Sequence, residues 1–153
     1  MPQLSFNSPV GPLALFEADE AIVALDWGWL PDNQPSALLL RARDQLEEYF
    51  DGKRQGFDLP LAPHGTPFQR KVWAELEKIP FGRTKSYGEL AAILGTAPRA
   101  LGGACGRNPI PVIIPCHRVL AAHGGLGGYS GLDGIETKEF LLRLEGCRLP
   151  HPG

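Results

Sequence analysis

The chain of 153 residues has few cysteines and no long apolar run. Its three cysteines, at positions 105, 116 and 147, are an odd number at wide spacing, which is not a disulfide framework. No apolar stretch approaches the roughly 20 residues that a membrane-spanning helix needs. The first residues also lack the basic and apolar regions of a secretory signal. We therefore expect an intracellular protein with no membrane partner.

Motifs for metals and nucleotide cofactors are missing as well. There is no CxxC pair, and the four histidines (His64, His117, His123 and His151) show no paired ligand spacing, so we predict no metal site. The glycine-rich segment 124–131 lacks the GxxxxGK[ST] pattern of a phosphate-binding loop and the flanking strand and helix of a dinucleotide site. It is either a flexible loop or a pocket wall for a flat ligand. We predict no cofactor.

The net charge of −2 is unevenly distributed along the chain. Residues 1–65 contain ten acidic and four basic residues, whereas residues 66–153 contain seven acidic and eleven basic ones. This asymmetry indicates two regions, of which the second meets an anionic partner, although random scatter would also produce it.

The acidic part predicts a small sheet and one helix. Strand-like runs at residues 13–16 and 22–27 flank a polar turn at 17–20, after an earlier turn at 8–12. Ser36 is a good N-cap for a helix that runs to about Phe50 and ends at Asp51 and Gly52. Residues 56–65, rich in proline and glycine, predict an irregular linker. We place an N-terminal α/β domain at residues 1–62 and a second domain at 63–153.

The basic part begins with two helices that carry capping boxes. Thr66 and Gln69 form the first, with a proline between them at the first helical position, and Pro80 ends that helix. Its apolar face consists of Phe68, Val72, Trp73, Leu76 and Ile79. Ser86 and Glu89 form the second box, and its short helix ends at Gly95. Another helix starts directly at residues 96–98, so the region from about 86 to 107 predicts a helix-turn-helix.

This last helix has two distinct faces. Helical spacing turns one set towards the core, namely Ala97, Ala100, Leu101 and Ala104. A second face carries Arg99, Gly102, Gly103 and Gly106. Because a glycine within a helix costs about 0.8–1 kcal/mol relative to alanine, this bare face calls for a reason. It allows close approach either of a neighbouring helix or of a nucleic-acid groove that Arg99 enters. The basic charge of this half favours DNA.

Cys116 is the candidate nucleophile. Residues 112–114 predict a short buried strand, and Pro115 is a favourable start for a helical turn that would bring free backbone N–H groups near the thiol. These groups, with the imidazole of His117, favour a thiolate. The alternative is a buried inert cysteine, which we expect for Cys105 and Cys147. Glu145 opposes the dipole of the helix it ends, just before Gly146, and is a candidate to orient His117.

In this order, the motifs resemble those of the O6-alkylguanine-DNA alkyltransferases (methylated-DNA–protein-cysteine methyltransferases). The matching segments are 66–69 (TPFQ), 72–73 (VW), 79–82 (IPFG), 86–87 (SY), 107–109 (RNP), 115–119 (PCHRV), 128–131 (GYSG), 138–142 (KEFLL) and 145–146 (EG). The resemblance is close over residues 66–146 and loose over residues 1–65.

The resemblance implies an N-terminal α/β lobe similar to ribonuclease H, followed by a mostly α C-terminal domain. It also implies a monomeric DNA repair protein that binds duplex DNA in the minor groove and flips out an O6-alkylguanine, or an O4-alkylthymine. The alkyl group would pass irreversibly to the protein in a single turnover, without a cofactor. The implied location is the cytoplasm with access to the chromosome, or the nucleus in a eukaryote.

Residue roles follow from the same resemblance. Cys116 is the alkyl acceptor, His117 its base through water, Glu145 the residue that orients His117, and Asn108 a brace. Tyr87 assists flipping and donates to the leaving base, and Arg99 fills the vacated stack. Further contacts to substrate or DNA are expected from Ala100, Gly102, Gly103, Gly106, Arg107, Arg118, Tyr129 and Ser130.

Some features depart from the family, and three other functions remain open. The link at 131–137 is longer than usual, which leaves tolerance of bulky alkyl groups open, and the zinc-binding cysteines of some relatives are absent. An alkyltransferase-like lesion binder would lack Cys116. A helix-turn-helix regulator would read the major groove with polar side chains, for which the glycine face is poor. A Cys-His hydrolase usually draws its dyad from distant residues and needs no DNA-binding helix.

Overall fold

The computed structural model of the protein describes residues 1–121, 125–126 and 134–147. The chain forms two compact units, Met1–His64 and Gly65–Gly153. None of the helices in the described residues combines the length and apolar character that crossing a membrane requires.

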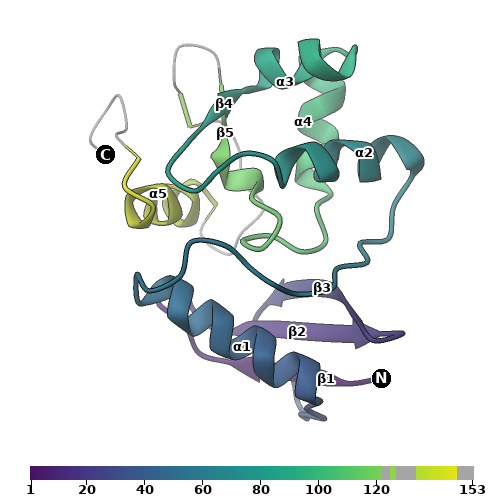
Figure 1. The fold of residues 1–153 in the computed structure, drawn as a ribbon, viewed down its shortest axis with the longest axis vertical. Coiled ribbons are helices and arrows are strands. Elements are labelled where there is room, and N and C mark those ends of the chain that lie inside the picture. The colour runs from purple at the N-terminus through teal and green to yellow at the C-terminus, as the bar shows by residue number, and fades with distance from the viewer. Residues whose placement is uncertain (122–124, 127–133, 148–153) are drawn as a thin grey trace. The chain divides into compact units, whose positions relative to one another are not determined.

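The first unit contains a three-stranded antiparallel sheet (Figure 1). Strands β1 (Gln3–Phe6), β2 (Leu13–Ala18) and β3 (Ala21–Trp27) lie in the order β1-β2-β3. The predicted hairpin is present, but only Asp19 and Glu20 form its turn, both with positive φ (50° and 63°) as tight hairpins require. β1 is missing from the prediction, because four residues are too few to show a clear alternation.

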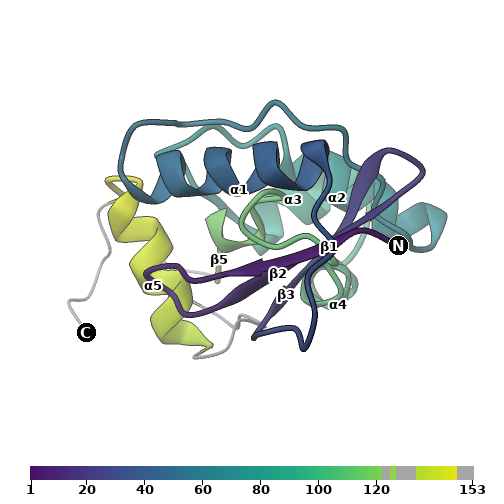
Figure 2. The ribbon, with the colours of Figure 1, turned by 90° about the horizontal axis from the view of Figure 1, so that it is seen from below.

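Helix α1 (Ala37–Phe50) lies along one face of this sheet (Figure 2). The Oγ of Ser36 accepts a hydrogen bond from the N–H of Leu39 at 3.1 Å, and Asp51 is the C-cap, so both predicted ends are confirmed. The buried face repeats every three or four residues and consists of Leu39, Ala42, Leu46, Tyr49 and Phe50. It packs with sheet residues such as Leu13, Leu15, Ile22 and Leu25, and this apolar contact is the core of the unit.

The segment predicted as a linker is bound to the first unit. The N–H of Ile22 donates to the carbonyl of Pro60 at 2.9 Å, and the N–H of Ala62 donates to the carbonyl of Ile22 at 2.8 Å. The buried Gln45 amide bonds both the N–H and the carbonyl of Asp58, at 2.9 and 3.2 Å. The segment is therefore irregular in conformation but tied to β3 and α1 as part of the unit.

The second unit is mostly helical. It contains α2 (Pro67–Leu76), β4 (Lys85–Ser86), α3 (Tyr87–Leu94), α4 (Pro98–Gly106), the 3-10 helix η1 (Cys116–Arg118), β5 (Val119–Leu120) and α5 (Ile135–Leu144). β4 and β5 pair in parallel. Both predicted capping boxes are present. α2 ends at Leu76, earlier than predicted, because the N–H groups of Lys78 and Ile79 bond back only three residues and tighten the chain. Phe68 is partly exposed, while the rest of the predicted apolar face is buried.

α3 and α4 are two short helices joined by a three-residue turn. Gly95 ends α3 with a φ of 65°, in the left-handed conformation that favours glycine. The Trp73 Nε1–H donates to the carbonyl of Ala104 at 2.9 Å and ties α2 to α4. Ala97 and Ala100 are exposed, so their predicted place in the core is wrong. The whole first turn of α4 is open, and burial starts only at Leu101.

Candidate active site

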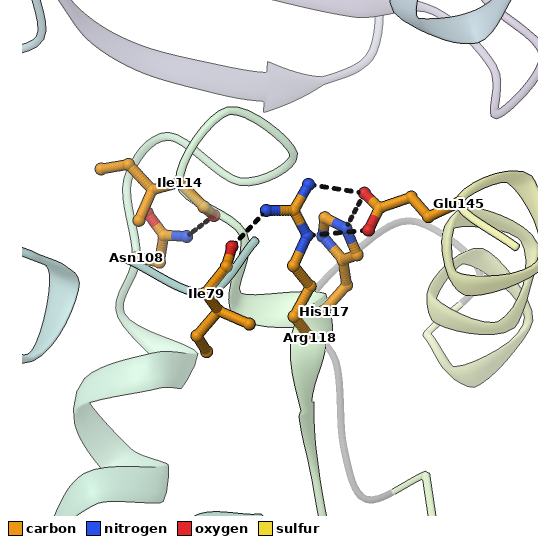
Figure 3. Close-up of polar contacts among 6 residues, drawn as sticks. All are labelled: Ile79, Asn108, Ile114, His117, Arg118 and Glu145. Atoms are coloured by element: carbon orange, nitrogen blue, oxygen red, sulfur yellow. Dashed lines mark hydrogen bonds and ion pairs between the residues drawn. The ribbon is translucent and has the colours of Figure 1, made fainter. Parts of the chain in front are cut away.

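Asn108 closes the loop that leads from α4 to Cys116. Its Oδ1 accepts from the N–H of Ile110 at 2.9 Å. Its Nδ2 donates to the carbonyl of Ile114 at 2.8 Å, as Figure 3 shows. The side chain itself is buried, with 6% of its surface exposed. One amide thus satisfies two buried backbone groups on opposite sides of the loop, which fits a bracing role.

The segment before Cys116 is a turn and not the predicted strand. Pro111 and Ile114 pair as an isolated bridge, and Val112 between them has a φ of 73°. This conformation is unfavourable for a β-branched residue, so the surrounding packing must hold it. A strand is prevented because the prolines at 109 and 111 lack the N–H groups for a ladder. The predicted burial of the segment is confirmed.

Cys116 lies at the start of η1, a single turn of 3-10 helix after Pro115. The residue is 5% exposed. Its N–H donates to the carbonyl of Ile114 at 2.8 Å, and the N–H of Arg118 donates to the carbonyl of Pro115 at 3.0 Å. The predicted turn is therefore present, but its first N–H is already used. A thiolate here needs a stronger source of positive charge than one short turn.

His117 and Glu145 meet inside the second unit although 28 positions separate them. The His117 Nε2 lies 2.7 Å from the Glu145 Oε2, and both side chains are buried (Figure 3). Because a carboxylate only accepts, the neutral ring carries its hydrogen on Nε2. The buried Nδ1 has no hydrogen-bond partner among the described residues. Burial lowers the pKa of His117, although the Glu145 carboxylate opposes this shift.

Arg118 takes a different place from the one predicted. It is buried, with its Nε 2.7 Å from one oxygen of Glu145 and its Nη2 3.0 Å from the other. Its Nη1 donates to the carbonyl of Ile79 at 2.6 Å (Figure 3), and its guanidinium carbon is 5.9 Å from the centre of the Phe81 ring. With its donors turned inward, the predicted contact of Arg118 with DNA is wrong. It pairs with Glu145 instead.

Lys138 is a buried cation that the sequence analysis did not single out. No part of it is exposed, and its Nζ donates to the carbonyl of Val119 at 2.6 Å and lies 5.7 Å from the centre of the Tyr87 ring. Burial lowers its pKa to about 8, and electrostatic interaction with Cys116 and Cys105 opposes that shift. Its spacing from Leu141 and Leu142 places it on the buried face of α5, which is the pattern that would have revealed it.

Two neutral groups complete this cluster. Tyr87, the first residue of α3, has its pKa raised to about 12 by burial and by the nearby Cys105 and Cys116. Burial and the Cys116 thiol likewise raise the pKa of Cys105 to about 12. Cys105 is buried, as predicted, and Cys147 is half-buried. Tyr87 and Cys105 therefore keep their protons at neutral pH.

The glycine face of α4 is open. An added Cβ at Gly103 or Gly106 would meet no described atom within 4 Å, and at Gly102 it would only touch the Tyr87 ring at 4.0 Å. Arg99, Ala100 and Arg107 are exposed as well. The described residues thus contain no neighbouring helix that would require these glycines.

Part of the predicted site lies outside the described residues. These are Tyr129, Ser130 and residues 131–133 of the unusual link at 131–137. Among residues 1–121, 125–126 and 134–147, no group of three or more His, Cys, Asp or Glu side chains is arranged to hold a metal ion.

Comparisons with known proteins match both units. The model of the 6-O-methylguanine DNA methyltransferase DNA-binding domain matches residues 67–147, and that of its ribonuclease-like domain matches residues 4–63. The methylated-DNA–protein-cysteine methyltransferase of Methanosarcina acetivorans is 42% identical over 92% of this chain and 96% of its own, and the constitutive enzyme of Bacillus subtilis is 42% identical over 91% and 92%. The solved structure of Mycobacterium tuberculosis OGT in complex with DNA has a TM-score of 0.87 at 42% identity, over 95% of this chain and 92% of that one. The chain belongs to the 6-O-methylguanine DNA methyltransferase family.

Proposed function

We propose that this protein repairs DNA by accepting the alkyl group of an O6-alkylguanine on Cys116. The observation that carries the proposal is the buried cluster around Cys116, in which His117, Glu145 and Arg118 are connected by short polar contacts. The open glycine face of α4 lies in the same unit. The named relatives are methyltransferases whose acceptor is a protein cysteine.

DNA binds to the pair α3 and α4, which act as a helix-turn-helix. Gly103 and Gly106 let the backbone of α4 come close to the minor groove, and exposed Arg99 enters it. Ala100 and Arg107 contact the same duplex. Arg99 fills the stack that the flipped guanine leaves, which is compatible with any sequence context.

The transfer is a single displacement. The Sγ of Cys116 attacks the alkyl carbon, a C–S bond forms, the C–O6 bond breaks, and its electron pair remains on the guanine. His117 removes the thiol proton through water with its free Nδ1, while Glu145 holds the ring. The Tyr87 hydroxyl stays protonated and donates a hydrogen bond to the leaving base. Asn108 holds the loop that leads to Cys116. Tyr129 and Ser130, which lie outside the described residues, are assigned to the contact with the base by the family resemblance alone.

The stable thioether makes the reaction stop after one turnover. The Cys105 thiol stays protonated and cannot readily remove the alkyl group. The protein acts as a monomer in the compartment that holds the chromosome, and O4-alkylthymine is a second substrate to test.

A duplex with labelled O6-methylguanine tests this proposal. We expect one label per chain, found by mass spectrometry on the peptide that contains Cys116, and a Cys116→Ala variant that still binds DNA but accepts nothing. Label mainly on Cys105 or Cys147 would refute the assignment. Release of the label with turnover would indicate a hydrolase, and binding without transfer would indicate a lesion-binding protein.

A further inference from the structure

The guanidinium of Arg118 connects three segments of the second unit. From η1 it donates through Nε and Nη2 to the two oxygens of Glu145, at 2.7 and 3.0 Å. Its Nη1 donates to the carbonyl of Ile79, in the turn after α2, at 2.6 Å. In Figure 3 the guanidinium lies between this carbonyl and the carboxylate. Because all three nitrogens of the planar group are bonded, Arg118 fixes the position and the plane of the Glu145 carboxylate.

The same carboxylate receives the ring of His117. Its Oε2 lies 2.7 Å from the His117 Nε2 and also accepts from the Arg118 Nη2. An ionised Glu145 can only accept, so the neutral ring carries its hydrogen on Nε2 and a lone pair on Nδ1. A carboxylate that holds an imidazole in one tautomer decides which ring nitrogen can act as a base. Arg118 therefore acts on the His117 ring through Glu145.

Loss of the Arg118 guanidinium would change what Glu145 can do. The Glu145 side chain has no exposed surface, and a buried carboxylate that loses a cation bonded to both of its oxygens favours its protonated form. A protonated carboxyl group can donate to the His117 Nε2, and the ring hydrogen then moves to Nδ1. A ring with hydrogen on Nδ1 cannot take the thiol proton there, although His117 and Glu145 stay in contact.

We propose that Arg118 is a positioning residue for alkyl transfer, which holds Glu145 as a carboxylate and thereby keeps the His117 Nδ1 able to accept the thiol proton. The inference rests on the proposed function, which assigns that proton to His117. The proton leaves the Cys116 Sγ and reaches Nδ1 through water. Arg118 and Glu145 keep their charges throughout, and neither contacts the alkyl group.

The tautomer of the His117 ring tests this role directly, without DNA. ¹⁵N NMR at about pH 8, where an unperturbed histidine is neutral, distinguishes hydrogen on Nε2 from hydrogen on Nδ1. We expect hydrogen on Nε2 in wild type and a large fraction on Nδ1 in Arg118→Met. The matched control is Arg143→Met, which removes the cation of an exposed pair with Glu139 and should keep the wild-type tautomer.

Single-turnover rates of alkyl transfer, expressed per folded chain, provide a second test. We expect Arg118→Met to slow the transfer by about 10²-fold, within the range of general-base groups. Arg118→Lys should restore part of the rate but remain about tenfold below wild type, because an ammonium keeps the charge and lacks the planar fork. In a Glu145→Gln background, Arg118→Met should have little further effect, since both changes act on one contact.

A purely structural Arg118 would give a different pattern. The folded fraction of Arg118→Met would fall, but its His117 ring would keep hydrogen on Nε2 and the rate loss would add to that of Glu145→Gln. Either result overturns the inference, as does an Arg118→Lys variant that reacts at the wild-type rate. If Arg118→Met alone does not fold, the Arg118→Lys rate and its combination with Glu145→Gln decide the question. A wild-type protein that accepts no alkyl group would instead refute the proposed function, while the tautomer result would stand.

Discussion

Glu145 occupies a position that helix electrostatics disfavours. It is the C-cap of α5, where a carboxylate opposes the helix dipole by about 0.3–1 kcal/mol. Its oxygens accept from His117 and twice from Arg118, and removing one member of a buried pair typically costs about 3–5 kcal/mol. The buried contacts therefore outweigh the dipole.

We expect Glu145→Gln to slow alkyl transfer by up to about 10²-fold, the lower end of what general-base groups contribute. The amide is neutral, so it leaves Arg118 without its anion and holds the His117 ring less firmly. Single-turnover rates on saturating O6-methylguanine duplex measure the effect. DNA affinity should change little, since Glu145 is buried.

The matched control for this variant is Glu139→Gln on the same helix. Glu139 forms a partly exposed i,i+4 pair with Arg143, the kind of pair that is worth about 0.3–0.5 kcal/mol. The Glu139→Gln substitution should therefore leave both the rate of alkyl transfer and the free energy of unfolding near the wild-type values. A Glu145→Gln protein that reacts as fast as wild type would reduce Glu145 to a structural helix end.

Among the elements, α4 contains three glycines, Gly102, Gly103 and Gly106, which lower its helix stability and leave one of its faces open. We expect Gly103→Ala to raise the free energy of unfolding by about 0.8–1 kcal/mol, because alanine is the better helix former and its Cβ meets no described atom. The same methyl group should weaken DNA binding, because it keeps the backbone from the groove. Chemical denaturation and duplex titration measure the two effects.

Gly82→Ala is the contrasting variant. Gly82 has a φ of 79°, and a Cβ there would lie 3.3 Å from the carbonyl oxygen of Glu145, so this substitution should destabilise the fold. If Gly103→Ala were also destabilising, the face of α4 would be a packing surface and its proposed contact with DNA would lose its support.

Arg99, in the exposed first turn of α4, belongs to the same element. We expect Arg99→Ala to slow repair of duplex DNA much more than reaction with free O6-methylguanine, because only the duplex requires a base to be unstacked, at a cost of a few kcal/mol. Two rate measurements on one variant suffice. Equal losses on both substrates would place Arg99 in the alkyl pocket or in the fold rather than in base extrusion.

For the whole molecule, His117 links stability to acid pH. Its pKa is lowered in the folded state, so between that value and about 6.5 the unfolded chain binds more protons. The contribution of the neutral His117 to the free energy of unfolding is therefore fully present above about pH 6.5 and is lost as the pH falls towards the lowered pKa of the folded state. Denaturation at a series of pH values should show this decline in wild type and a weaker one in His117→Gln. His64→Gln, at an exposed position, should retain the full decline.

The features of the fold that the sequence predicts correctly depend on contacts between residues that are close together in the chain. The capping boxes at Thr66 and Ser86, the N-cap at Ser36 and the left-handed Gly95 each involve groups within about four residues. Such contacts form in any fold that contains the segment, so they can be predicted from the sequence. The change from acidic to basic composition near residue 65 also coincides with the boundary between the two units. Composition and short-range chemistry thus determined most helices and the identity of the reactive segment.

Contacts between distant segments could not be obtained in this way. Arg118 reaches Glu145 across 27 positions and Ile79 across 39, and nothing near Arg118 in the chain indicates that it is buried. Ala100 has the spacing of a core residue, yet the first turn of α4 extends beyond its neighbours. Lys138 becomes a buried cation, bonded to the carbonyl of Val119, only because α5 packs with η1. Burial and charge compensation depend on which elements pack together, and only the folded chain determines that.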